Sequence, residues 1–196
     1  MEFIKLLKKT WHFIWEDNSI WSWLVNIVLA FVLIKYLIYP GLGLLLGTSF
    51  PIVAVVSTSM EHDSNFDSWW DSQKGLYADF NITKEEFAKF NFKNGFNKGD
   101  IMVLVGKKPE NIAVGDILVY KAGMPDPIIH RVVAKKNDNG VYVFQTKGDH
   151  NLAQIKSYWL DETSVLQGAV VGKAAIRIPY LGWVKILFVD LLGMIP

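Results

Sequence analysis

The chain has 196 residues, of which 51% are hydrophobic and 20% are charged, and its formal net charge is +1. This length is sufficient for one domain and a membrane anchor. The near-neutral charge, without a Lys/Arg block interleaved with aromatic residues, argues against nucleic acid as a partner. Cysteine is absent, which excludes disulfides, a thiol nucleophile and thiolate metal ligands.

The N-terminal part of the sequence is typical of a membrane anchor. Residues 2–15 mix apolar and basic side chains, a pattern that favours an amphipathic helix at a membrane surface over an ordinary soluble helix. Residues 19–39 are almost wholly apolar and, as a helix, would measure about 31 Å, enough to cross the hydrocarbon core. We therefore expect a cytoplasmic or interfacial segment at 1–18 and a transmembrane anchor at 19–39.

The flanks of this apolar run predict its orientation. Lys5, Lys8 and Lys9 precede it, whereas residues 40–60 contain no lysine or arginine. The positive-inside rule then places the N-terminus in the cytoplasm and the remaining domain, 40–196, outside the cell membrane. No small-x-small site follows directly, so the anchor is expected to stay uncleaved. Pro40 with Gly41 is expected to end the helix.

Residues 61–98 are interpreted as a polar and largely irregular insertion. Thr83 and Glu86 have the spacing of a capping box, which predicts a short helix. The aromatic residues of the segment favour a small satellite core over a lipid or partner surface. They are Trp69, Trp70, Phe92 and Phe96.

A metal site in the same insertion is a weaker hypothesis. Its potential ligands are histidine and aspartate side chains, but no second histidine has ligand spacing, and a solvated loop explains them better. These residues are His62, Asp63, Asp67 and Asp71.

Short strands dominate the rest of the chain. A β-branched run from Ile52 to Val56 predicts a first buried strand. Later strands, separated by glycine, proline and asparagine turns, are expected at 100–105, 116–120, 128–134 and 141–146, with one or two more within 165–178. The pattern predicts a mainly β fold, an antiparallel sandwich or partial barrel. The apolar but interrupted C-terminus predicts a helix that packs on this domain or lies in the membrane interface.

Ser59 and His130 are the residues with the most chemical interest. A serine becomes a strong nucleophile only when a base takes its proton. His130 lies in a strand run where β-branched residues would be expected, so it is either a base or a satisfied histidine of the β domain. His62 and His150 are expected in a loop and a turn. Asp149, also in a turn, could orient His130 as the acid of a triad does.

Four motifs occur in a fixed order along the chain. They are Ser-x-Ser-Met at 57–60, Gly-Asp-Ile-Leu at 115–118, His-Arg-Val at 130–132 and Lys-Gly-Asp-x-Asn at 147–151. Behind an N-terminal span, this order resembles type I signal peptidases, membrane-anchored serine endopeptidases that remove signal peptides from exported proteins. Bacterial members have lysine where this chain has His130, so the chain resembles the archaeal and endoplasmic-reticulum branch.

The resemblance implies roles for single residues. Ser59 matches the nucleophile and His130 the general base. Ser57 matches the hydroxyl that lines the oxyanion site with the backbone N–H of Ser59. Asp149 matches the aspartate of the Gly-Asp motif. Eukaryotic members carry a further aspartate a few residues later, which this chain lacks, so the acid is either Asp149 or Asp161.

The resemblance also implies substrates and partners. Signal peptides of preproteins would be cut after small residues, which requires shallow apolar pockets. An extended substrate would pair with a strand edge at Val53, Val55 and Val56. The lipid bilayer and the protein-translocation machinery are the implied partners, and neither a cofactor nor a metal is implied.

Two other functions stay open. A self-cleaving serine peptidase of the repressor type uses serine and lysine and carries a DNA-binding domain, where this chain has His130 and an anchor. A non-catalytic, membrane-anchored β domain that binds secretory partners is separated from an enzyme only by the set Ser59, His130 and Asp149.

Overall fold

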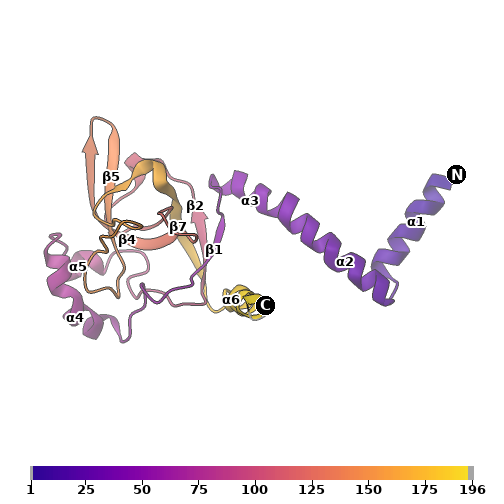
Figure 1. Ribbon diagram of the computed structural model, residues 1–196, viewed down its shortest axis with the longest axis horizontal. Coiled ribbons are helices and arrows are strands. Elements are labelled where there is room, and N and C mark those ends of the chain that lie inside the picture. The colour runs from indigo at the N-terminus through magenta and orange to yellow at the C-terminus, as the bar shows by residue number, and fades with distance from the viewer. Residues whose placement is uncertain (1, 194–196) are drawn as a thin grey trace. The chain divides into compact units, whose positions relative to one another are not determined.

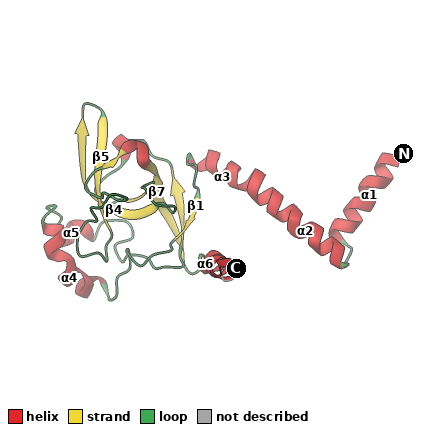
Figure 2. Ribbon diagram, in the orientation of Figure 1, coloured by secondary structure: helices red, strands yellow, loops and turns green. Residues whose placement is uncertain are grey.

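The computed structural model describes residues 2–193 of the protein. The chain forms two compact units, which divide between Leu45 and Leu46. The first unit is helical, and the second contains all of the strands (Figures 1 and 2).

The helical unit has an amphipathic helix followed by a long apolar one, as the sequence predicts. Ser22 Oγ donates a hydrogen bond to the Phe13 carbonyl, and Asn26 Nδ2 donates one to the Ile14 carbonyl. These polar groups therefore fasten the corner between the two helices. The elements are α1 (Glu2–Trp15), α2 (Ile20–Leu33), the π-helical turn η1 (Ile34–Ile38) and α3 (Tyr39–Leu46).

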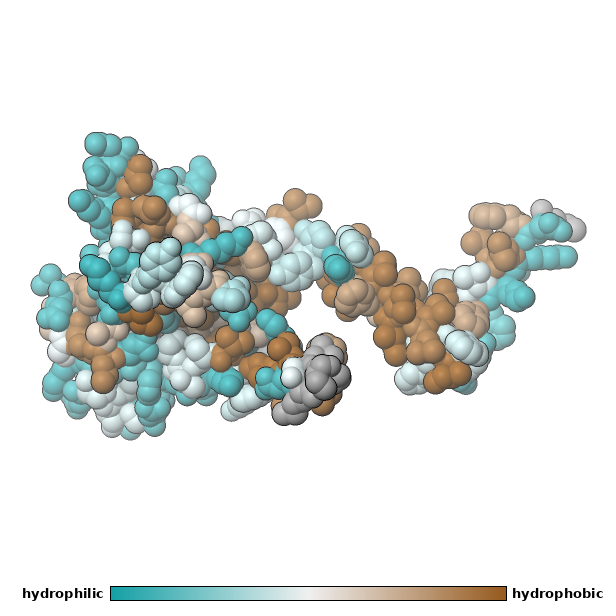
Figure 3. Space-filling model, viewed as in Figure 1, coloured by the Kyte–Doolittle hydropathy of each residue, from teal (hydrophilic) through white to brown (hydrophobic). Residues whose placement is uncertain are grey.

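The helix from Ile20 to Leu46 is long and apolar enough to cross a membrane, by length and composition. Figure 3 shows hydrophobic side chains along α2. At 27 residues the helix is longer than predicted, because Pro40 does not end it. The preceding turn is π-helical, with the Tyr39 N–H bonded to the Ile34 carbonyl, and Pro40 is the second residue of the helix α3 that follows it. Proline lacks an N–H and is tolerated in the first turn that follows such a local rearrangement.

The second unit is built on a seven-stranded sheet in which every neighbouring pair is antiparallel, and this confirms the predicted mainly β fold (Figure 2). The strand order is β1-β2-β7-β3-β4-β5-β6. The strands are β1 (Ile52–Ala54), β2 (Ile101–Val105), β3 (Ile117–Tyr120), β4 (Ile128–Asp138), β5 (Val141–Lys147), β6 (Val165–Leu166) and β7 (Val170–Ile178). Two short 3₁₀ helices are η2 (Pro109–Asn111) and η3 (Gln167–Ala169).

The sheet is bent and buries apolar side chains on both faces. Register shifts interrupt the β2–β7, β3–β7 and β4–β5 pairs, and such bulges bend strands. Because successive side chains alternate between faces, Ile117 and Val119 of β3 enter one cluster, whereas Leu118 and Tyr120 enter the other. The centre of the sheet, which includes β3 and β4, is therefore packed with apolar side chains on both faces.

The insertion at 61–98 is more regular than the sequence suggested. It contains a helix, α4 (Phe66–Ala78), which begins at the N-cap Asn65. The sequence pattern did not predict this helix, because its buried face mixes the polar Gln73 with aromatic residues. The buried positions, which recur with helical spacing, are Trp69, Trp70, Gln73 and Tyr77.

A second helix, α5 (Lys84–Phe87), begins with the predicted capping box of Thr83 and Glu86. The helices α4 and α5 pack on Val133 of β4 and form the expected satellite core. Phe92 and Phe96 do not join it but pack with the main β cluster. The buried members of the satellite core are Trp69, Trp70, Tyr77, Ile82, Phe87 and Val133.

The predicted C-terminal helix is α6 (Trp183–Gly193). The Gly182 N–H donates to the Gly99 carbonyl, and a Cβ on Gly182 would lie 2.7 Å from the Asp100 carbonyl oxygen, so the helix starts tightly against the β unit. Ile186 is buried, whereas most apolar side chains of the helix are exposed. The exposed ones include Val184, Leu187, Phe188 and Leu191.

Candidate active site

Ser59 and His130, which lie 71 residues apart in sequence, meet in the structure. Nε2 of His130 is 2.9 Å from Oγ of Ser59. His130 is on β4 opposite Leu118 of β3, and its side chain is almost fully buried. An imidazole at this distance can take the proton of the serine hydroxyl.

The loop that carries Ser59 is fixed at both ends. Val55 before it and Met60 after it are buried in the main cluster of the β unit. Between them, Ser57 is exposed, and its Oγ lies 3.0 Å from Oγ of Ser59. The buried Val55 and Met60 thus anchor the loop, and the serine hydroxyls between them face outward.

Glu162 is the carboxylate that contacts His130. Its Oε1 lies 2.5 Å from Nδ1 of His130, and the residue is 0% exposed. The Ile155 N–H donates to Oε2 at 2.6 Å, and Thr146 Oγ1 lies 3.3 Å from Oε1. Since an ionised carboxylate only accepts, Nδ1 of His130 carries the proton in this pair and Nε2 is free to accept the proton of Ser59.

Neither aspartate proposed as the acid contacts His130 in the structure. Asp161 accepts the N–H and the hydroxyl of Thr163 at 2.9 and 2.6 Å. Its neighbour Glu162 lies in a turn and directs its carboxylate to His130 instead. Residue type favoured aspartate in the sequence analysis, and the direction of each side chain was not readable from the sequence.

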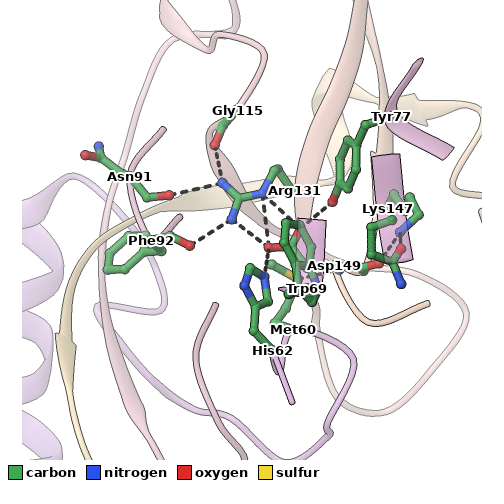
Figure 4. Close-up of polar contacts among 12 residues, drawn as sticks. Met60, His62, Trp69, Tyr77, Asn91, Phe92, Gly115, Arg131, Lys147 and Asp149 are labelled. Atoms are coloured by element: carbon green, nitrogen blue, oxygen red, sulfur yellow. Dashed lines mark hydrogen bonds and ion pairs between the residues drawn. The ribbon is translucent and has the colours of Figure 1, made fainter. Parts of the chain in front are cut away.

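Asp149 instead lies at the centre of a separate buried network (Figure 4). Nη2 of Arg131 donates to its Oδ2 at 2.7 Å, and Nε lies 2.9 Å from Oδ1. Tyr77 Oη donates to Oδ1 at 2.7 Å, and Nε2 of His62 lies 3.1 Å from Oδ2. His62 lies in a loop, as the sequence predicts, but its side chain is buried in the packed interior.

Charge in this network is balanced by its partners. Burial raises the pKa of Asp149, but the Arg131 guanidinium and the hydrogen bond from His62 outweigh burial and hold the pKa of the carboxyl well below its usual range. Burial and the nearby Asp149 carboxylate raise the pKa of Tyr77, so its hydroxyl remains a donor. The network is therefore an ionised carboxylate surrounded by donors.

A mostly apolar pocket opens beside Ser59 and His130. Its volume is about 460 Å³. Its apolar lining comes from the turn before β4, from the first residue of β4 and from the loop that precedes Glu162. These residues are Met124, Ile128, Ile155, Trp159 and Leu160.

Strand β1 forms one edge of the sheet, with β2 as its only strand partner among the described residues. The Leu104 N–H donates to the Pro51 carbonyl, and the Val55 N–H donates to the Asp100 carbonyl. Backbone groups alternate in direction along an antiparallel strand. Those of Pro51, Val53 and Val55 therefore face β2, whereas those of Ile52, Ala54 and Val56 face the open edge.

Of the three valines predicted to pair with the substrate, one has backbone groups that face the open edge. Val56 directs its backbone groups outward and is exposed. The backbone groups of Val53 and Val55 face β2 within the sheet, and the side chain of Val55 is buried in the core. Ile52 and Ala54 take the place of these two valines as positions with free backbone groups.

The residues of the alternative metal site are dispersed. Within residues 2–193, no group of three His, Asp or Glu side chains could hold a metal ion. Each of the four contacts a different side chain: His62 with Asp149, Asp63 with His150, Asp67 with Lys84, and Asp71 with Lys74.

Comparison with known proteins relates the chain to one group of enzymes, although no protein-family model matches it. It is 31% identical over 157 residues to the signal peptidase complex catalytic subunit SEC11C of Homo sapiens, an alignment that covers 79% of this chain and 65% of that protein. It is 28% identical to SEC11 of Scheffersomyces stipitis over 158 residues, with 79% and 75% coverage. SEC11 of Yarrowia lipolytica is 24% identical over 159 residues, with 80% and 73% coverage. The chain thus spans slightly less than two thirds of the length of the mammalian relatives.

Proposed function

We propose that this protein is a membrane-anchored type I signal peptidase, a serine endopeptidase that removes signal peptides from secreted preproteins. The observation that carries the proposal is the contact of Ser59 with His130, backed by Glu162. The similarity to signal peptidase catalytic subunits supports it. With histidine at the base position, we assign the chain to the Ser-His branch that archaeal and endoplasmic-reticulum enzymes share.

The mechanism begins with proton transfer from Ser59 to Nε2 of His130. The serine oxygen attacks the carbonyl carbon of the last signal-peptide residue, and His130 then donates the proton to the leaving amine as the peptide bond breaks. His130 next deprotonates a water molecule, which attacks the ester carbonyl. The signal peptide leaves with a free carboxylate, and Ser59 regains its proton.

Glu162 is the acid in this mechanism, in preference to Asp149 or Asp161. Its carboxylate fixes the tautomer of His130 and stabilises the imidazolium that forms when Ser59 loses its proton. The 2.5 Å contact and full burial support this role.

Ser57 has the role of an oxyanion donor. Its hydroxyl lies 3.0 Å from Oγ of Ser59, close to where the carbonyl oxygen of a bound substrate develops negative charge. The backbone N–H of Ser59 would be the second donor.

The substrate is an extended peptide that ends in small residues at the cleavage site. It would pair with the open edge of β1 through Ile52, Ala54 and Val56, as peptides add to exposed sheet edges. The apolar pocket beside Ser59 would receive its side chains. Binding of this kind selects extended, uncharged sequence.

The membrane placement follows the charge pattern. The helix Ile20–Leu46 spans the cell membrane, with residues 1–18 in the cytoplasm and the β unit outside. The exposed apolar side chains of α6 lie in the membrane interface. At this location the enzyme meets precursors as the translocation machinery delivers them.

Cleavage by the purified full-length protein in detergent tests the proposed function. A preprotein with alanine before the scissile bond is expected to be cut there, as mapped by the mass of both products, and the same preprotein with phenylalanine at that position is expected to resist. A protein that binds both preproteins and cuts neither would favour the non-catalytic β domain.

A further inference from the structure

The insertion at 61–98 supplies two of the side chains that bind Asp149 (Figure 4). Tyr77 of α4 donates to Oδ1 at 2.7 Å, and His62 lies 3.1 Å from Oδ2. Both are buried, and His62 stacks on Trp69 with ring centroids 3.6 Å apart. Because the acceptor is an ionised carboxylate, Nε2 of His62 must donate. These contacts form inside the protein and not over a surface.

Helix α4 also binds Lys147, the first residue of the turn at 147–151. Nζ of Lys147 lies 3.1 Å from Oε1 of Gln73 in α4, and it also donates to the Gly148 carbonyl at 3.0 Å. The insertion thus holds the turn at 147–151 by hydrogen bonds to Lys147 as well as to Asp149.

The turn at 147–151 also contacts the backbone of Ser59. The His150 N–H donates to the Ser59 carbonyl at 2.9 Å. A Cβ on Gly148 would lie 2.8 Å from the Ser59 carbonyl oxygen, so turn and loop are in close packing. The Asp149 N–H lies 3.4 Å from Sδ of Met60. A shift of the turn would therefore move Ser59 relative to His130.

We infer that His62 and Tyr77 are positioning residues for Ser59: they fix the Asp149 turn, and the turn fixes the carbonyl of the nucleophile. The inference rests on the proposed function and assigns the insertion a role as an internal clamp of the active site. Displacements of about 1 Å at reacting atoms lower the rate strongly, so loss of a clamp donor acts on the chemical step more than on binding.

Tyr77→Phe tests the inference because it removes only the hydroxyl that reaches Asp149. We expect kcat for preprotein cleavage to fall about tenfold, with KM within twofold of wild type. His62→Leu removes the other donor and is expected to act similarly, whereas His62→Gln, which keeps a donor, is expected to recover most of the rate.

Phe66→Leu is the matched control. Phe66 packs in the same satellite core against Trp69, Trp70 and Phe87. This variant is expected to lower the melting temperature as much as Tyr77→Phe and to keep kcat within twofold. If Tyr77→Phe and His62→Leu also keep kcat within twofold, the inference is wrong.

Hydrogen exchange separates this inference from the proposed function. In Tyr77→Phe, the amide of His150 is expected to exchange at least tenfold faster than in wild type, while in Phe66→Leu it is unchanged. Unchanged exchange at His150 in Tyr77→Phe would overturn the inference whether or not the protein cleaves preproteins. Cleavage that survives Ser59→Ala would instead overturn the proposed function.

Discussion

Oε1 of Glu162 lies 2.5 Å from Nδ1 of His130, on the side of the imidazole away from Ser59. The carboxylate is fully buried and held by the Ile155 N–H and the Thr146 hydroxyl. This contact completes a Ser–His–Glu arrangement in which the acid comes from the segment after β5. The motifs in the sequence had instead predicted an aspartate, Asp149 or Asp161, at this position.

Glu162→Gln should reduce kcat by roughly 10²- to 10⁴-fold, because an amide neither stabilises the imidazolium nor fixes the tautomer of His130. Steady-state cleavage of a preprotein measures the effect. Asp161→Asn is the matched control. Its kcat should stay within twofold of wild type, since the side chain of Asp161 binds Thr163 and does not contact His130. A large loss in Asp161→Asn with little loss in Glu162→Gln would reassign the acid.

Ser57→Ala should lower kcat by about 10²-fold with little change in KM, as expected for removal of one oxyanion donor. The hydroxyl is 3.0 Å from Oγ of Ser59 and exposed, so folding should be unaffected. Ser64→Ala, at an exposed position of the insertion, is the control. Equal activity of the two variants would remove Ser57 from the oxyanion site.

Asp149→Asn should destabilise the β unit by about 3–5 kcal/mol, because it leaves the Arg131 guanidinium buried without its counter-charge. Denaturant unfolding of the full chain in detergent at pH 7 measures this. The pKa of Asp149 is lowered in the folded state, so its contribution is complete above the unfolded pKa near 4 and is lost as the pH falls below that value. The unfolding free energies of wild type and variant should therefore converge in acid, and a constant difference would contradict this account.

Lys147 predicts a second rise of stability with pH, in the alkaline range. Burial, partly offset by Asp149 and Glu162, lowers the pKa of Lys147 from 10.5 to about 8. Between these values the unfolded chain binds more protons than the folded one, so the free energy of unfolding gains up to about 3 kcal/mol as the pH rises through this window. Lys147→Met lacks this gain. Wild type and variant are compared at pH 8 and pH 10, and parallel behaviour would refute the assignment.

The open edge of β1 can be tested with proline. Ala54→Pro removes an N–H that faces the edge and should raise KM about three- to tenfold, the effect of one hydrogen bond to the substrate, with the melting temperature nearly unchanged. Val53→Pro removes an N–H that faces β2 and should lower the melting temperature instead. If Ala54→Pro binds and cleaves as wild type, the substrate does not pair with this edge.

Much of the β unit was predictable because its strands are β-branched runs bounded by turn residues. The pairing of Ser59 with His130 was also predictable, but only from motifs, since residue pattern alone left His130 open. Helix α4 was missed because its buried face contains Gln73 among aromatic residues. Glu162 was missed because the sequence does not state which of two adjacent carboxylates points inward. Pro40 was misleading because a π-helical turn allows the helix to continue.

The most direct measurement of the central claim is the cleavage rate of full-length Ser59→Ala in detergent with a preprotein substrate. Because the change removes only the hydroxyl of Ser59, we expect His130 and Glu162 to keep their positions, so that any loss reports on the nucleophile itself. We predict that the rate falls at least 10⁴-fold while the melting temperature stays within about 2 °C of wild type. A rate within tenfold of wild type at the same cleavage site would show that Ser59 is not the nucleophile.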